Sequence, residues 1–152
     1  MKKFVLLVST IVICITTQSC SQKKENSNKY LQDYNTIIFE SKRKKICVSD
    51  DFSSLEEWIK EKNGEYKQVQ KKLNFSKNER DSLAKYAYRI INQPTLATKV
   101  LTCGAGENIT IEISYGSTSI SCKYSSIESW SSLSNDNKKL YEILNAKTAI
   151  PK

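Results

Sequence analysis

The chain has 152 residues, of which 39% are hydrophobic and 26% charged, and its formal net charge is +8. Length and composition fit one globular domain and exclude a disordered or collagen-like chain. The sequence has no histidine, which removes the commonest general base and the commonest metal ligand. The basic residues are not interleaved with aromatic ones as in nucleic-acid-binding segments, so we expect no nucleic-acid partner.

The N-terminal segment has the three-part layout of a secretory signal. Lys2 and Lys3 precede an apolar run over residues 4–15, and a short polar stretch then leads to Cys20. A helix over residues 4–17 would span roughly 21 Å at about 1.5 Å per residue, less than the roughly 30 Å hydrocarbon core. The pattern therefore predicts a signal peptide rather than a membrane span.

Residues 17–20 (TQSC) resemble the lipobox of bacterial lipoproteins, although Thr17 stands where that family usually has leucine. The resemblance implies that signal peptidase II removes residues 1–19 and that lipid is attached to Cys20. Acyl chains anchor a protein stably when more than one is present. Ser21, in place of aspartate, implies sorting to the outer membrane. We therefore expect a lipoprotein anchored to a membrane of the cell envelope, with ordinary cleavage and release as the alternative.

The rest of the chain divides into a tether and one domain. Residues 20–30, which begin with the lipidated cysteine, are polar, charged and free of aromatic side chains up to Tyr30, so they predict a flexible tether. Residues 31–152 are expected to form a single globular domain. This domain resembles no family that we recognise.

Two strands are predicted first, over residues 34–40 and 45–49, because these segments are rich in aromatic or β-branched residues. The basic run between them, residues 42–45 (KRKK), is expected to form the turn. The adjacency of two short strands predicts antiparallel pairing.

A helix is predicted next. Residues 53–57 (SSLEE) contain two overlapping capping boxes, which are typical of a helix start. Leu55, Trp58 and Ile59 follow at helical spacing, and Gly64 stands where a C-cap belongs. These signals predict a helix that ends at this glycine.

A weaker strand is predicted over residues 65–73, followed by the best helix of the chain. Ser76 and Glu79 form a capping box at its start, and Pro94 is expected to stop it. Its apolar residues recur at spacings of three and four: Leu83, Tyr86, Ala87, Ile90 and Ile91.

From residue 96 onward the apolar period changes from helical to two. Residues 98–103, 108–115 and 118–124 are predicted to form a three-stranded meander, in which Gly116 begins a two-residue type II′ turn. A last helix is expected to follow Ser134. The predicted order is β-β-α-β-α-β-β-β-α. This order predicts an α+β fold in which about three helices pack on one face of a mostly antiparallel sheet.

The cysteines predict one disulfide in an oxidising compartment. Two of the five lie in residues 1–20, which leaves Cys47, Cys103 and Cys122. If Cys122 faces Ile111 on the middle strand of the meander, Cys103 lies about 10 Å away at about 4.8 Å per strand. A bridge needs Cα atoms closer than about 7 Å. The expected pair is therefore Cys47 with Cys103 or Cys122, and three buried thiols are the alternative.

No motif predicts catalysis, a metal or a cofactor. Ser82 and Lys85 have the S-x-x-K spacing of penicillin-binding proteins and β-lactamases, but Ser82 lies within its predicted helix and the chain is too short for that fold. Asp50 and Asp51 are candidate paired carboxylates, or else residues that serve the positive end of the predicted first helix. The absence of both histidine and Cys-x-x-Cys spacing argues against a metal site.

Three functional hypotheses follow. The leading one is a small lipoprotein that holds a non-enzymatic binding or protective domain in the envelope, with an inhibitor or immunity protein as its concrete form and an envelope protein as its partner. The second is an envelope hydrolase that uses serine with Asp50 or Asp51. The third is a structural spacer between membrane and cell wall.

Overall fold

A computed structural model describes residues 33–93 and 106–152. Within these ranges the protein is α+β, with one six-stranded antiparallel sheet and two α-helices. The elements in chain order are β1 (Thr36–Glu40), β2 (Lys44–Val48), β3 (Ser53–Lys60), β4 (Tyr66–Lys72), α2 (Lys77–Ile91), β5 (Glu107–Tyr115), β6 (Thr118–Ile127), a 3₁₀ turn (Trp130–Ser132) and α3 (Asn135–Asn145).

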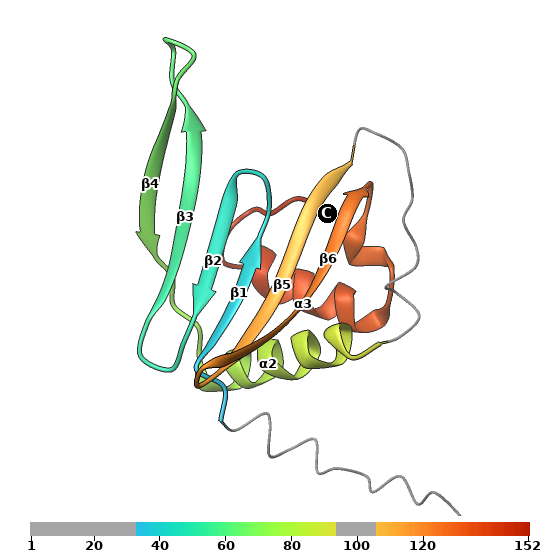
Figure 1. Cartoon of the computed structure of the whole chain (residues 1–152). Coiled ribbons are helices and arrows are strands. Elements are labelled where there is room, and N and C mark those ends of the chain that lie inside the picture. The colour runs from blue at the N-terminus through green and yellow to red at the C-terminus, as the bar shows by residue number, and fades with distance from the viewer. Residues whose placement is uncertain (1–32, 94–105) are drawn as a thin grey trace, which may run out of the picture.

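The strand order in the sheet is β4-β3-β2-β1-β5-β6, and every neighbouring pair is antiparallel (Figure 1). The first four strands follow one another as a meander. After α2 the chain returns to the other side of β1, where β5 pairs with it and β6 follows through a tight turn. Both helices lie on the same face of the sheet, which leaves the opposite face open (Figure 1).

The core lies between the sheet and the helices. Alternate residues of β1, β2 and β5 point to the helices because side chains alternate along a strand. Trp130 of the 3₁₀ turn is fully buried, and its ring centroid lies 5.2 Å from that of Phe39 on β1. The strand residues that contribute to this core include Ile37, Phe39, Ile46, Val48, Leu55, Ile109, Ile111 and Ile113.

Helix α2 forms as its sequence predicts. The Ser76 hydroxyl accepts a hydrogen bond from the Glu79 backbone N–H at 3.2 Å, and the Glu79 carboxylate accepts one from the Ser76 N–H at 2.7 Å. This capping box satisfies two backbone donors at the helix start. The buried face carries Leu83, Ala87 and Ile90, at spacings of four and three residues.

Helix α3 and the residues after it close the other side of the core. Ser134 caps the helix, because its hydroxyl accepts a hydrogen bond from the Asn137 N–H. The Asn137 side chain is fully buried and donates to the Tyr124 hydroxyl at 3.1 Å. After the end of α3, the Pro151 carbonyl accepts a hydrogen bond from the Trp130 indole N–H at 2.9 Å. These bonds tie the C-terminal residues to the core.

The helix predicted over residues 53–64 is wrong, because Ser53–Lys60 form strand β3. Strand β3 pairs with β2 on one edge and with β4 on the other, so two ladders of backbone hydrogen bonds override the local helix signals. Leu55 and Trp58 do not share a face: Leu55 is buried against the helices, and Trp58 points to the open face. Gly64 has φ +89° in the β3–β4 turn rather than at a helix end.

The strands predicted over residues 34–40, 45–49 and 65–73 are confirmed as β1, β2 and β4. The helices predicted after Ser76 and Ser134 are confirmed as well. About three α-helices were predicted, and the described residues contain two. The segment predicted as the remaining helix forms strand β3.

The hairpin predicted around Gly116 is confirmed, because β5 pairs with β6 from Tyr115–Thr118 through Ile111–Cys122. The strand predicted over residues 98–103 lies outside the described residues. The other edge of β5 pairs with β1. The predicted meander placed residues 98–103 beside β5 on this edge. That pairing is wrong, because β1 occupies the position.

The predicted signal peptide, lipidated Cys20 and tether lie outside the described residues. Within 33–93 and 106–152, no helix is long and apolar enough to cross a membrane.

Candidate functional site

The β3–β4 hairpin extends beyond the rest of the sheet (Figure 1). The last pairing of β2 with β3 joins Lys44 to Glu57, whereas β3 continues to Lys60, which pairs with Tyr66 of β4. Neither helix covers this extension (Figure 1). Every residue of β4 except Val69 is exposed. The hairpin is thus a regular element that buries little apolar surface.

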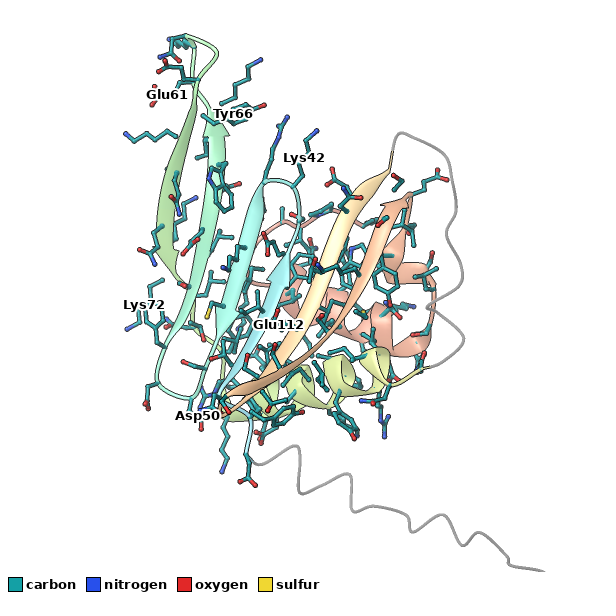
Figure 2. All side chains as sticks on the ribbon, viewed as in Figure 1. Lys42, Asp50, Glu61, Tyr66, Lys72 and Glu112 are labelled. Carbon is teal, nitrogen blue, oxygen red and sulfur yellow. The ribbon has the colours of Figure 1, made fainter. Side chains whose placement is uncertain are left out.

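A hollow of about 410 Å³ lies between this hairpin and the β1–β2 turn. Figure 2 shows Lys42 of the turn and Tyr66 of the hairpin at this same end of the molecule. The register of the sheet brings these segments together although they are distant in sequence. The hollow is lined by Glu40, Ser41, Lys42, Arg43, Trp58 and Tyr66.

Arg43 and Tyr66 interact across the hollow. The Arg43 Nη2 donates a hydrogen bond to the Tyr66 hydroxyl at 3.3 Å, and the guanidinium carbon lies 5.5 Å from the centre of the tyrosine ring. The second contact is a cation–π interaction, worth about 0.5–1 kcal/mol at an exposed site. Tyr66 is nevertheless 51% exposed and Arg43 is exposed as well, so the ring and the cation are both accessible to solvent.

Trp58 is held in the hollow by the backbone. Its N–H donates to the Arg43 carbonyl at 2.9 Å, one pair beyond the end of the β2 strand. On the other side it pairs with Gln68 of β4. The half-buried indole is therefore presented from a strand with neighbours on both edges, which limits the entropy lost on binding.

The charges around the hollow alternate in sign. Glu40, Lys45 and Glu56 are cross-strand neighbours on the open face, and opposite charges in such positions stabilise a sheet.

On the helix-side face, the Glu57 carboxylate lies 2.9 Å from the Lys44 Nζ and 3.4 Å from the Lys71 Nζ. The hydrogen bond from Lys44 is the largest of the effects that lower the pKa of Glu57. These ion pairs add to the β2–β3 backbone ladder and to buried Leu55 in joining the hairpin to the body of the domain.

The candidate carboxylates of the hydrolase hypothesis lie far from this hollow. Asp50 and Asp51 are both exposed in the β2–β3 turn, and Figure 2 shows Asp50 at the opposite end of the sheet from Tyr66. Asp50 Oδ1 lies 3.9 Å from Arg80 Nε. Ser82 is half-buried within α2. The described residues therefore provide no enclosed pair of carboxylates beside a nucleophile at these positions.

Cys47 and Cys122 are not bonded to each other. Cys47 lies on β2 and Cys122 on β6, with β1 and β5 between them, so about 14 Å separates their strands at about 4.8 Å per step. Cys47 also points to the open face, whereas Cys122 is paired with buried Ile111. Burial raises the pKa of both thiols. Cys103 lies outside the described residues, so its pairing with Cys47 stays a prediction.

No group of metal-ligating side chains occurs within the described ranges. The arrangement at the hollow is suited to binding: two aromatic rings, two cations and one carboxylate surround an open space. The Ser41 hydroxyl, which also lines the hollow, donates a hydrogen bond to the Lys44 carbonyl at 3.3 Å.

The sequence reasoning missed this hollow. Of the basic run at residues 42–45, Lys42 and Arg43 lie in the turn as predicted, whereas Lys44 and Lys45 belong to β2. The helix predicted over residues 53–64 places Trp58 on an apolar helix face instead of beside this turn. The signal that would have found the site is alternation: Ser54, Glu56, Trp58 and Lys60 occupy one face when the segment is counted with period two.

In comparisons with protein-family models, curated proteins and solved structures, nothing matches this chain.

Proposed function

We propose that this protein is a small lipoprotein of the bacterial envelope whose domain binds another envelope protein through the β3–β4 hairpin and its hollow. The binding is non-enzymatic, and it inhibits or protects against the partner as an inhibitor or immunity protein does. The lipobox-like residues 17–20 support the anchor, and the protruding hairpin supports the binding role. A tether would let the domain reach partners near the membrane surface.

The observation that carries this proposal is the gathering of Arg43, Trp58 and Tyr66 around one hollow. Tryptophan, tyrosine and arginine are the residue types most enriched among the few residues that dominate protein–protein affinity. They come here from three strands or turns that the fold holds in fixed register. A hollow of about 410 Å³ accommodates one or two anchoring side chains of a partner.

Photo-crosslinking in intact cells tests the proposed surface. A photoreactive phenylalanine analogue replaces Tyr66 in the hollow, and the same analogue at exposed Ser119 on β6 serves as the control. We expect one defined adduct from position 66 and none of that mass from position 119. The adduct should disappear in Trp58→Ala, because loss of a central anchor weakens binding about 30-fold or more. An adduct that forms equally at both positions, or none at all, contradicts the proposal.

Mass spectrometry of the detergent-extracted protein tests the anchor. We expect a mature chain that begins at an acylated Cys20, and release of the Cys20→Ala variant from membranes. An unmodified N-terminus on a freely diffusing protein would show that the anchor is wrong while leaving the binding surface to the crosslinking experiment.

A further inference from the structure

We infer that the free edge of β4 is a docking site to which an acidic, extended segment of the partner adds as a further strand. This inference rests on the proposed function, because it names the part of the partner that binds beside the hollow. Three observations carry it: the direction of the β4 backbone groups, the regularity of the strand, and its charge.

The backbone of β4 offers hydrogen-bonding groups to solvent. The Leu73 N–H donates to the Ser53 carbonyl at 2.8 Å, and the Glu61 N–H donates to the Glu65 carbonyl at 2.7 Å. Both bonds join odd-numbered residues, one pair beyond each end of the β3–β4 ladder. Because hydrogen-bonded pairs occur at every second residue of an antiparallel ladder, the odd-numbered residues of β4 direct their backbone N–H and C=O groups to β3. The N–H and C=O groups of Gln68 and Gln70 therefore point away from the sheet. An added strand satisfies such groups directly.

The two edges of the sheet differ in regularity. Strand β4 keeps one unbroken register with β3 from Tyr66 to Lys72. Strand β6, at the other edge, keeps its register with β5 from Thr118 to Tyr124, and a register shift then interrupts its last residues, where Ser126 adopts a positive φ of 51°. Bulges of this kind twist an edge and block further pairing. Of the two described edges, β4 is therefore the one that stays in register along its whole length.

The charge of β4 selects the kind of strand that binds. It contains Lys67, Lys71 and Lys72 and no acidic residue. Lysines on an edge prevent pairing with a second copy of the same strand, because like charges would meet across the new ladder. The same lysines favour a segment with acidic side chains. Lys67 and Lys71 lie on the helix-side face. Lys71 already lies 3.4 Å from the Glu57 carboxylate, so Lys67 is the cation that a partner carboxylate on this face would meet first.

The hollow and the edge adjoin each other at Tyr66, which lines the hollow and begins β4. The side chains of Tyr66, Gln68 and Gln70 point to the open face. A strand added to β4 would place its apolar residues along this face and its acidic residues on the other. Edge and hollow together then form one continuous contact surface.

A designed peptide tests the inference on the full-length protein in detergent micelles. The probe is an eight-residue peptide, blocked at both ends, that alternates glutamate and valine, and the matched control has lysine in place of glutamate. We expect saturable binding of the acidic peptide and at least tenfold weaker binding of the basic one. Hydrogen exchange of the Gln68 and Gln70 amides should slow at least tenfold on binding. The Val69 amide, which faces β3, should change by less than twofold.

Two substitutions at one position separate backbone from side chain. Gln70→Pro removes an N–H that points away from β3, and we expect it to weaken peptide binding at least tenfold. Gln70→Ala keeps the N–H, and we expect affinity within threefold of the original. Lys67→Glu gives an independent measurement, since it should reduce the preference for the acidic peptide at least threefold.

Failure of the acidic peptide to bind would overturn the inference. So would an equal loss in the Pro and Ala variants, or slowed exchange around the hollow without any change along β4. The two proposals fail in different ways. If the cellular adduct formed from position 66 depends on Trp58 but not on Gln70→Pro, the added strand is wrong and the binding surface stands.

Discussion

The body of the domain and the β3–β4 hairpin belong to one sheet but are stabilised differently. In the body, alternate residues such as Ile46 and Ile111 are 0% exposed against the two helices. In the hairpin, Ile59 and Tyr66 are 44% and 51% exposed. Burial of apolar area contributes about 25 cal/mol per Å², so nearly all hydrophobic stabilisation lies in the body. Beyond Leu55, which is buried in the core, the hairpin depends on backbone hydrogen bonds and on a few charged contacts.

This difference is the reason for placing the proposed binding surface on the hairpin. A long, exposed hairpin is an aggregation hazard unless charges guard its edge, and β4 carries three lysines there. The aromatic residues Trp58 and Tyr66 lie in the hairpin rather than in the core. Stability alone does not require them at these positions. The body thus acts as a scaffold that holds the hairpin in a fixed register.

The sharpest test of the scaffold is Trp130→Ala. Trp130 is 0% exposed, packs at 5.2 Å from the Phe39 ring, and donates to the Pro151 carbonyl. We expect the free energy of unfolding to fall by about 3–5 kcal/mol, as for other buried aromatic residues. Urea denaturation measures it, with Trp130→Phe as a milder control. A loss below about 1 kcal/mol would mean that the core is not centred on this ring.

Alkaline pH should weaken the body through Tyr34. Burial, more than the nearby Asp50 carboxylate, raises the pKa of this phenol to about 12. The folded state therefore holds the proton more tightly than the unfolded state, whose tyrosine pKa is about 10. The contribution of Tyr34 is fully present below pH 10 and is lost as pH rises towards 12. It amounts to at most about 2–3 kcal/mol at about 1.4 kcal/mol per pKa unit.

We expect Tyr34→Phe to flatten the decline of the unfolding free energy between pH 10 and 12. Stability measured by urea denaturation across this range gives the comparison, with exposed Tyr66→Phe as the matched control. Equal slopes in the original protein and in Tyr34→Phe would contradict a buried, protonated phenol at this position.

The junction between body and hairpin should respond weakly to Glu57→Gln. This change removes a carboxylate that contacts Lys44 and Lys71, and pairs of this kind contribute about 0.2–1 kcal/mol. Since the pKa of Glu57 is lowered in the fold, its contribution is present above pH 4–5 and is lost as pH falls through the folded pKa. We expect the difference between the two proteins to shrink both below pH 4 and in 1 M salt. Thermal unfolding at several pH values measures it.

A small effect on stability is also expected from Tyr66→Ala. The ring is half exposed and its cation–π contact with Arg43 is an exposed one, so we expect the unfolding free energy to fall by no more than about 1 kcal/mol. The same substitution should nevertheless abolish partner binding at the hollow, measured as competition with the photo-crosslinked adduct. A large loss of stability would show that the ring serves the fold rather than a partner.

Local signals were sufficient to predict much of the fold. The capping box of Ser76 and Glu79 places the start of α2 because its hydrogen bonds join residues only three apart. Likewise Gly116, with φ +56°, fixes the β5–β6 turn and so the pairing of Tyr115 with Thr118. Each of these features depends on neighbours in sequence, so the sequence alone identifies it.

The remaining features depend on neighbours that only the folded chain supplies. Residues 53–57 carry helix-start signals, yet they form a strand because β2 and β4 offer hydrogen-bond partners on both edges. The position of β1 beside β5 likewise requires the return of the chain through α2. The hollow joins Glu40, Trp58 and Tyr66 through that register. Tertiary structure decided the site, because sheet pairing brings together residues that are distant in sequence. No local sequence pattern identifies such pairing partners.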